Sequence, residues 1–272
     1  MEETGEATPG ERFVLPPPPG FRRLRLAVEY DGSAFLGWQV QPEGRTVQGA
    51  LEAALVPLGP HGRVVAAGRT DAGVHARRMP AHVDVAFSLP PGQVLRALNA
   101  RLPEDARVLE CQEAPPAWHA RFSCRWRAYR YRILNRPVSS PLERCRALWV
   151  PQPLDSAAMR EAVGRLVGRH DFAAFATQEE RQTEREVLAV RLDATRDGAD
   201  LLIAGESFLR HMVRGITGTL VQVGLGKLDA TGVEAALASR SRAQAGPNVG
   251  PQGLYFEAAG YDPWSGWDGV AT

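Results

Sequence analysis

The hydrophobic pattern of this chain switches between a period of two and a period near 3.6 in a fixed order, and that order constrains the fold most. Leu24, Leu26, Val28 and Tyr30 alternate with more polar residues, as in a half-buried strand. The first half predicts, in order, a strand over 24–30, a helix over 47–58 capped by Thr46, strands over 63–68 and 83–87, a helix over 90–102 and a strand over 106–112. This β-α-β-β-α-β order is typical of a ferredoxin-like unit.

The second half repeats the order. It predicts a strand over 127–134, a helix that begins at Asp155 or Ser156, strands near 186–194 and 200–206, a helix over 208–223, a short helix over 230–239 and a last strand over 254–260. We therefore predict an α+β fold of two tandem ferredoxin-like units, with mainly antiparallel sheets flanked by helices. The expected boundaries are a flexible acidic, Pro-rich tail over 1–20, a first domain over 21–115, a second domain over 116–262 and a C-terminal tail over 263–272.

The composition predicts a soluble, globular protein of the cytoplasm. The 272 residues are 44% hydrophobic and 23% charged. No apolar run approaches the roughly 18–20 residues that a membrane helix needs, and the acidic N-terminus lacks the apolar stretch of a secretory signal. The three cysteines are odd in number and have no CxxC spacing, so we expect free thiols in a reducing compartment.

A glycine-rich loop over 68–75 carries the best candidate for a catalytic acid. Its sequence is GRTDAGVH, and Asp71 is the only acid between Glu52 and Asp84. Glycines let the backbone turn sharply and approach a ligand, and Arg69 offers a planar fork to a phosphate. An ordinary Asp-Gly-type turn with a solvated arginine would have the same sequence, so the loop alone leaves both interpretations open.

A segment rich in arginine points to RNA. Residues 118–146 contain eight arginines and one acid, Glu143, a net charge of +7, whereas the whole chain carries +1. Tyr129 and Tyr131 share one face of the predicted strand, and arginines occupy the other. Aromatic rings interleaved with arginine suit an unstacked base and its phosphates, so we expect one tyrosine in the core and one exposed to the site. In the alternative interpretation, both tyrosines are core residues and the arginines are solvated.

A second basic candidate lies late in the chain. Arg214 is the candidate for a distant arginine that pairs with the Asp71 carboxylate. On the predicted 208–223 helix it lies opposite the apolar stripe. In the alternative interpretation, Arg210 and Arg214 form a solvated basic face. The six histidines show neither HExxH nor Cys/His zinc spacing, and the chain has no Walker loop, GxGxxG motif or nucleophile elbow. We therefore expect neither a metal nor a nucleotide cofactor.

Six blocks, in order, together resemble the tRNA pseudouridine synthase A family. They are Tyr30-Asp31-Gly32 with Phe35-Leu36-Gly37-Trp38-Gln39 and Thr46-Val47-Gln48; residues 68–76; His119-Ala120-Arg121-Phe122-Ser123 with Tyr129-Arg130-Tyr131; Asp171-Phe172 with Phe175; residues 208–214; and Gly253-Leu254-Tyr255. The resemblance extends over nearly the whole folded part, from about residue 24 to residue 261.

The resemblance implies an isomerase that converts uridine to pseudouridine at positions 38 to 40 of the tRNA anticodon stem-loop, without a cofactor. It implies Asp71 as the essential carboxylate, acting as nucleophile at C1′ or as base at C2′. It further implies that Tyr129 stacks on the flipped base, that Arg214 pairs with the aspartate and that Leu254 packs beneath the site. Arg69 would enter the RNA stem when the base leaves it. The family's homodimer, with tRNA spanning both subunits, is the expected assembly.

Arginine-rich surfaces supply much of the affinity for RNA and make it depend on salt. The residues that we expect at the RNA surface, besides Arg69, Tyr129 and Leu254, are His75, Arg121, Arg125, Arg127, Arg130 and Arg210. Three alternatives stay open: a non-catalytic RNA-binding protein, a pseudouridine synthase with a different RNA target, and a metal-dependent hydrolase that uses Asp71 with His75 and His82.

Overall fold

Each half of the chain contributes mainly antiparallel strands, with helices packed on them. The computed structural model describes residues 14–177 and 182–270, so most of the predicted N-terminal tail lies outside the described residues. The first unit comprises Met1–Arg125 with Ala258–Pro263, and the second comprises Trp126–Glu257 with Trp264–Thr272. No helix in the described parts of the chain is long and apolar enough to cross a membrane.

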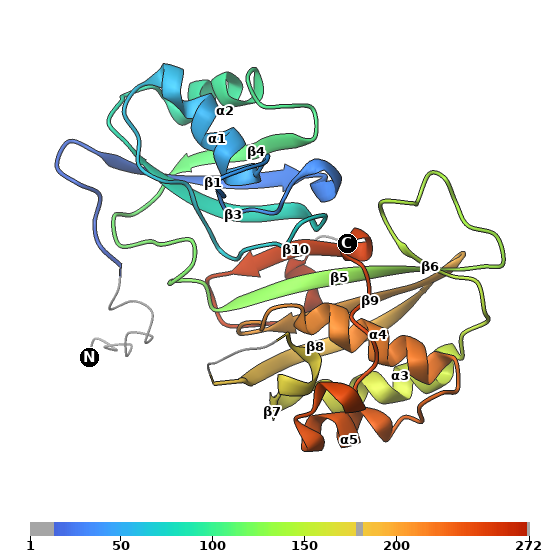
Figure 1. Cartoon of the computed structure of the whole chain (residues 1–272). Helices are drawn as coiled ribbons and strands as arrows, with labels where there is room; N and C mark the ends of the chain where they lie inside the picture. The colour runs from blue at the N-terminus through green and yellow to red at the C-terminus, as the bar shows by residue number, and fades with distance from the viewer. Residues whose placement is uncertain (1–13, 178–181, 271–272) are drawn as a thin grey trace, which may run out of the picture. The chain divides into compact units, whose positions relative to one another are not determined.

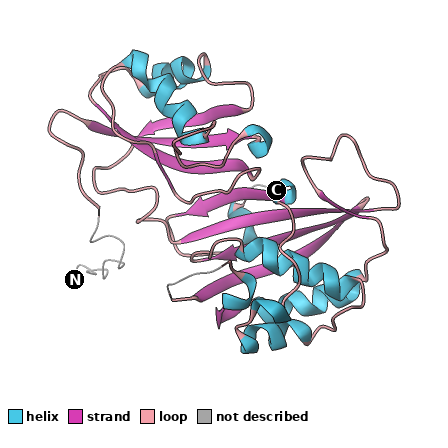
Figure 2. Cartoon of the chain, in the orientation of Figure 1, coloured by secondary structure: helices cyan, strands magenta, loops and turns pink. Residues whose placement is uncertain are grey.

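The first unit has the predicted β-α-β-β-α-β order (Figure 1). Its elements are β1 (Arg22–Tyr30), α1 (Val47–Leu55), β2 (Val65–Ala66), β3 (His75–Val85), α2 (Pro91–Asn99) and β4 (Ala106–Glu113). Strand β1 pairs antiparallel with both β3 and β4, and β2 pairs antiparallel with β3. The helices α1 and α2 lie side by side on one face of this sheet (Figure 2).

Local sequence explains where α1 begins and ends. The Thr46 side chain accepts a hydrogen bond from the Gly49 backbone N–H at 3.2 Å and so caps the helix, as predicted. Leu51 and Leu55 are fully buried on its inner side. A 3-10 turn over Val56–Leu58 ends at Gly59, whose φ of +133° no other residue adopts easily.

The second unit contains the predicted strands and helices, together with two short strands that were not predicted. Its elements are β5 (Trp126–Asn135), β6 (Leu148–Val150), α3 (Ser156–Val163), β7 (Gly168–Asp171), β8 (Glu184–Thr195), β9 (Gly198–Gly205), α4 (Met212–Gly224), α5 (Gly232–Ser239) and β10 (Leu254–Gly260). The strand order is β10-β5-β9-β8-β7, and β6 adds to β5 in parallel. Residues 258–260 of β10 belong to the first unit.

One predicted helix begins later than expected. The sequence predicted a helix over 208–223, but α4 begins at Met212 because His211 adopts a left-handed conformation with φ +63°. Phe208 therefore lies in the turn that leads to the helix and not on a helical stripe. Nearly all of α4 is buried, so it does not have the solvated basic face that its sequence allowed.

The C-terminal tail packs on the second unit. Trp264 contacts both Trp126 and Trp267 edge to face, with ring centroids 4.9 Å and 5.2 Å apart, and the Arg191 guanidinium lies 5.0 Å from the Trp267 ring. Such contacts add to the apolar burial of the rings. The tail over 264–270 is therefore part of the folded second unit.

A buried polar cluster holds the segment after residue 115 on the first unit. Arg23 is 5% exposed, binds both carboxylate oxygens of Asp84, and donates to the carbonyls of Pro116 and Trp118. Beside it, burial, helped by neighbouring positive charge, lowers the pKa of His82 to about 3 and that of His119 to about 4. Both rings use Nδ1 to accept backbone N–H groups of the segment 120–122.

These histidines predict a loss of stability in mild acid. Their pKa values are lowered in the folded chain, so between pH 6.5 and about 4 the unfolded chain binds more protons than the folded chain. The free energy of unfolding therefore decreases as the pH decreases through this range. His82→Gln should make this dependence shallower in urea titrations between pH 7 and 4.5. His61→Gln, at a partly exposed position of the same unit, serves as the control. An unchanged slope in His82→Gln would show that the buried rings do not govern acid stability.

Candidate active site

The predicted acidic loop connects β2 to β3 and presents Asp71 at its tip. The Val74 N–H donates to the Asp71 carbonyl at 3.2 Å, and Gly73, with φ +78°, completes the turn. Asp71 is half-buried, whereas Arg69 is exposed and Thr70 is only 7% exposed. The loop thus offers a partly sheltered carboxylate beside an arginine that solvent or a ligand reaches freely.

The segment 30–38 fixes this loop from below. The Tyr30 hydroxyl and the Thr70 hydroxyl are 2.7 Å apart, and the Trp38 N–H donates to the Thr70 carbonyl at 3.0 Å. The Gly73 N–H donates to the Phe35 carbonyl at 3.3 Å. Two blocks of sequence that lie far apart in the chain therefore form one structural piece.

Gly37 makes this close approach possible. Its φ is +95°, and a Cβ there would lie 2.5 Å from the Thr70 carbonyl oxygen. A side chain at this position would push the Asp71 loop away from the segment below it. The glycine is therefore required by geometry on both counts.

His75 supports the loop and does not line the RNA surface. Its ring is 2% exposed, and Nδ1 lies 3.1 Å from the Gly32 backbone nitrogen and 3.1 Å from Asp31 Oδ1. The His75 ring fixes the turn at 31–32, and its burial does not fit the predicted contact with RNA. The expected partner of His75 in a metal site, His82, is buried in the cluster around Arg23.

Both tyrosines of β5 are buried in the second unit. Tyr131 is fully buried and its hydroxyl donates to the Gly250 carbonyl at 2.6 Å. Tyr129 is 8% exposed and meets the rings of Phe208 and Phe256 edge to face, with centroids 5.0 Å and 5.3 Å apart. The expectation that one of the two would be exposed is therefore wrong, although Tyr129 is the more accessible and is held rigidly from two sides.

Arg214 lies in the first turn of α4. Its Nε donates to the Val249 carbonyl at 2.7 Å, and its side chain is half-buried. The guanidinium is close enough to Tyr131 to oppose the rise in that tyrosine's pKa that burial causes. Leu254, 6% exposed, begins β10 directly after Gly253, where a Cβ would lie 2.6 Å from the Tyr131 ring.

The arginines expected at an RNA surface fall into two groups. Arg121, Arg125 and Arg210 are exposed. Arg130 lies against Asp200 and Glu257, at 3.3 Å and 2.9 Å, with its side chain 14% exposed. These two carboxylates compensate the Arg130 charge, so we correct its assignment from an RNA contact to an internal ion pair.

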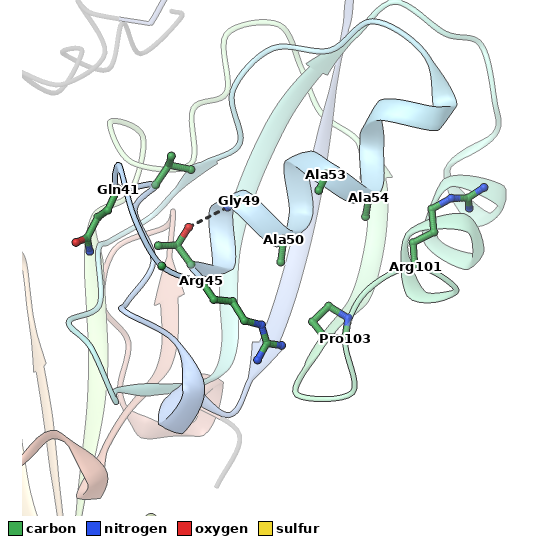
Figure 3. Close-up of a pocket in the computed structure, with 11 residues that line it drawn as sticks. Gln41, Arg45, Gly49, Ala50, Ala53, Ala54, Arg101 and Pro103 are labelled. Carbon is green, nitrogen blue, oxygen red and sulfur yellow. Dashed lines mark hydrogen bonds between the residues drawn. The ribbon is translucent and has the colours of Figure 1, made fainter.

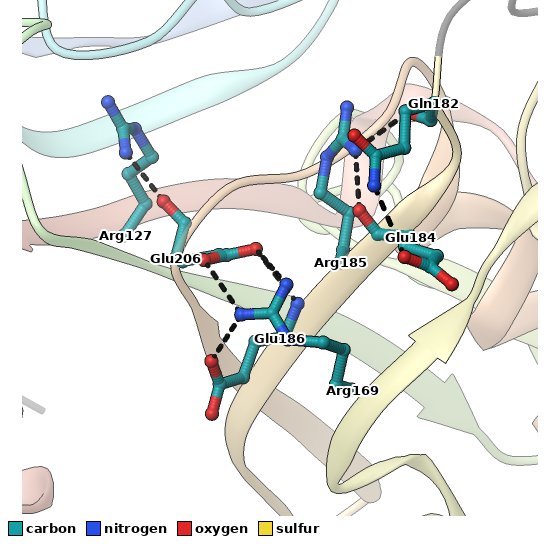
Figure 4. A network of polar contacts seen from close by, with 7 residues as sticks. All are labelled: Arg127, Arg169, Gln182, Glu184, Arg185, Glu186 and Glu206. Carbon is teal, nitrogen blue, oxygen red and sulfur yellow. Dashed lines mark hydrogen bonds and ion pairs between the residues drawn. The ribbon is translucent and has the colours of Figure 1, made fainter. Parts of the chain in front are cut away.

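Arg127 belongs to a polar network on the second unit (Figure 4). Its Nη1 donates to the Glu206 carbonyl at 2.7 Å, while the Glu206 carboxylate lies 3.4 Å from Arg169. Arg169 also binds Glu186 at 2.8 Å. Arg127 thus anchors the strand end that precedes Phe208, a supporting role that the sequence did not indicate.

One surface hollow lies away from these residues. It has a volume of about 610 Å³ and lies on the first unit beside the small residues of α1 (Figure 3). Arg45 lines it but is bound to both oxygens of Asp105. None of the predicted site residues lines this hollow.

Among the residues that the structure describes, no group of three or more His, Cys, Asp or Glu side chains is placed to hold a metal ion.

The predicted catalytic and binding residues are therefore divided between the units. The first unit carries Asp71 on its supported loop with Arg69, and also Arg121 and Arg125. The second carries Tyr129, Arg214 and Leu254, which its core holds in fixed positions, together with Arg210. An α+β chain with these features matches a family model described as tRNA pseudouridine synthase over residues 26–123 and 162–262.

Several curated proteins are similar along almost their full length. The tRNA pseudouridine synthase A of Thermus thermophilus is 52% identical over 245 residues, which cover 88% of this chain and 97% of that protein. The proteins of the same name from Zymomonas mobilis and Bradyrhizobium diazoefficiens are 45% and 46% identical over 243 residues, 88% of this chain and 99% of each relative. The chain belongs to the tRNA pseudouridine synthase family, a class of isomerases.

The close contact between Gly37 and the Asp71 loop leads to a prediction about stability. Gly37→Ala should lower the free energy of unfolding by roughly 1–3 kcal/mol, because it adds a side chain at positive φ and against the Thr70 carbonyl. Gly92→Ala is the matched control, since a Cβ there has no neighbour within 4 Å. Urea unfolding of the two variants beside the wild type measures this; equal losses in both would contradict the close approach at Gly37.

Proposed function

We propose that this chain isomerises uridine to pseudouridine at positions 38 to 40 of the tRNA anticodon stem-loop, with Asp71 as the catalytic carboxylate. Membership of the family supports the reaction class. The observation that carries the assignment of Asp71 is its position at the tip of a loop that three hydrogen bonds from the segment 30–38 hold in place. A catalytic group must be positioned in this way before it can act on a substrate.

The reaction needs positioning and a carboxylate. The bond between N1 of uracil and C1′ of ribose breaks, the base turns, and a bond between C5 and C1′ forms, after which C5 loses its proton and N1 gains one. Asp71 acts either as a nucleophile at C1′ or as a base that removes the proton at C2′. Atoms and electrons balance without an oxidant, a metal or a nucleotide, so we expect no cofactor.

The residues of the second unit serve the flipped base in this proposal. Tyr129, fixed by Phe208 and Phe256, offers a rigid aromatic face or edge for stacking. Arg214 provides the positive partner for the Asp71 carboxylate, and Leu254 provides an apolar floor. These roles follow the family's pattern, and the burial of Tyr129 and Leu254, with the half-buried Arg214, suits groups that must not move during turnover.

The exposed arginines provide the RNA surface. Arg69, Arg121, Arg125 and Arg210 are accessible and suit phosphate contacts, which fix the register of an RNA on a protein. Extruding a base costs a few kcal/mol, and an arginine inserted into the vacated stem offsets part of this cost. Arg69, next to the catalytic loop tip, is the residue that we place in the stem.

Assembly and compartment complete the proposal. The expected assembly is a homodimer that shares each tRNA between subunits, acting in the cytoplasm on unmodified transcripts. A non-catalytic RNA-binding protein and a synthase with another RNA target are the alternatives, and both are outcomes of the experiments below.

Asp71→Ala and Asp71→Asn should abolish turnover while tRNA binding stays near that of the wild type, because neither variant alters the exposed arginines. Tritium release from C5-labelled uridine in unmodified tRNA, in the presence of EDTA and without cofactor, measures turnover. Mapping the release to a position in the tRNA identifies the uridine that is modified. Turnover by Asp71→Ala would refute the carboxylate assignment. Absence of release by the wild type, with binding intact, would favour the RNA-binding alternative, and release at another position would favour the different target.

Arg69→Ala should slow a single turnover by about an order of magnitude, because part of the few kcal/mol needed for base extrusion is no longer offset. Arg96→Ala is the matched control, an exposed arginine on α2. Single-turnover rates and tRNA affinities at two salt concentrations separate flipping from phosphate binding. If Arg69→Ala and Arg96→Ala have the same rate and affinity as the wild type, Arg69 does not enter the stem.

A further inference from the structure

The turn before α4 adopts a conformation that its residue does not favour. His211 has φ +63° and ψ +4°, the left-handed region, and its side chain does not cap the helix that follows. Among the described residues other than glycine, only His211 and Arg240 have positive φ. A histidine adopts this conformation where its surroundings impose it, and such residues gather at functional sites.

The surroundings that impose it centre on Thr177. The Thr177 hydroxyl lies 2.5 Å from His211 Nδ1, and the Thr177 N–H donates to the Arg210 carbonyl at 3.1 Å. Asn248 Nδ2 donates to the same hydroxyl at 3.3 Å. One hydroxyl group therefore bonds both to the ring of His211 and to the amide of Asn248.

The start of α4 is then enclosed between two segments of backbone. A Cβ on Gly215 would lie 2.3 Å from the Phe175 carbonyl oxygen, and one on Gly218 would lie 1.8 Å from the Pro247 carbonyl oxygen. The segments that hold the helix are therefore those that contribute Thr177 and Asn248 to the hydrogen bonds at His211. A shift at Thr177 would move the first turn of the helix.

Arg214 is the residue that these contacts position. It lies in that first turn, one residue before Gly215, and its Nε donates to the carbonyl of Val249, the residue after Asn248. The backbone turn at His211, the Thr177 hydroxyl and the Arg214 guanidinium are thus linked through a few hydrogen bonds within the second unit.

We propose that Thr177 and His211 are positioning residues, which hold the first turn of α4 so that Arg214 keeps its place in catalysis. The inference rests on the proposed function, because it needs Arg214 to serve the reaction. Neither residue is assigned contact with the substrate; both act through the arginine.

The decisive experiment measures kcat and KM for unmodified tRNA in Thr177→Val, which matches threonine in shape but has no hydroxyl. We expect kcat to fall by roughly tenfold to a hundredfold, as small misplacements of catalytic groups do, with KM unchanged. Thr177→Ser, which keeps the hydroxyl, should restore kcat. In an Arg214→Lys background, Thr177→Val should cause no further loss, because the two changes affect the same group.

A second variant keeps the test decisive where Thr177→Val does not fold. His211→Gly accepts the left-handed backbone without steric cost but has no ring, and we expect it to lose kcat as Thr177→Val does. Thermal melts of each variant confirm that the second unit is folded. Wild-type kcat in the folded variants would overturn the proposal, as would losses that add fully to those of Arg214→Lys. A wild type without activity on tRNA would instead refute the proposed function, so the two failures are distinguishable.

Discussion

The contact between the Asp71 loop and the segment 30–38 is the constraint on which the rest of the site depends. A loop rich in glycine gains freedom to turn but loses entropy when it is fixed, so it needs partners to hold a carboxylate in one place. Tyr30, Phe35 and Trp38 provide those partners through one hydroxyl and two backbone bonds. Gly37 lets the two backbones approach, and His75 fixes the turn below. In the proposed function, the position of Asp71 is thus defined mostly by residues that take no part in the chemistry.

The arginines illustrate how one residue type is used in two ways. Arg23 and Arg130 are buried or nearly so, and each lies against carboxylates because an unpaired charge in such a place would be costly. Arg121 and Arg125 come from the same basic segment but remain exposed. The number of arginines in a segment therefore overestimates the positively charged surface that RNA can reach. An arginine that faces a buried carboxylate on a neighbouring strand is not part of that surface, and strand register decides which arginines these are.

The order of elements and the residue types of the loop could be predicted from the sequence, because period, caps and glycine positions are local properties. Thr46 and Asp155 cap α1 and α3 as expected, and the β-α-β-β-α-β order of the first unit is confirmed. The late start of α4 could not be predicted, since it depends on Thr177 and Asn248, which lie 34 and 37 positions from His211. The burial of His75 and the pairing of Arg130 are likewise set by partners that only the folded chain brings near. The hydrophobic period also missed β6 and β7, which are too short to show one.

The same reasoning explains why local signals were weakest where the site is built. The site contains a histidine in the left-handed conformation, a glycine packed against a carbonyl and a half-buried carboxylate. The residues next to each of them in the sequence do not favour these arrangements. Such disagreements persist only where distant segments over-determine the conformation, and here those segments are 30–38 for the Asp71 loop and 173–177 with 246–249 for α4. Rigidity on both units is therefore supplied by backbone contacts at glycine and by single hydroxyl groups, Thr70 and Thr177. If the proposed roles hold, a substitution that removes one of these hydroxyls, but leaves every charged residue in place, will shift Asp71 or Arg214.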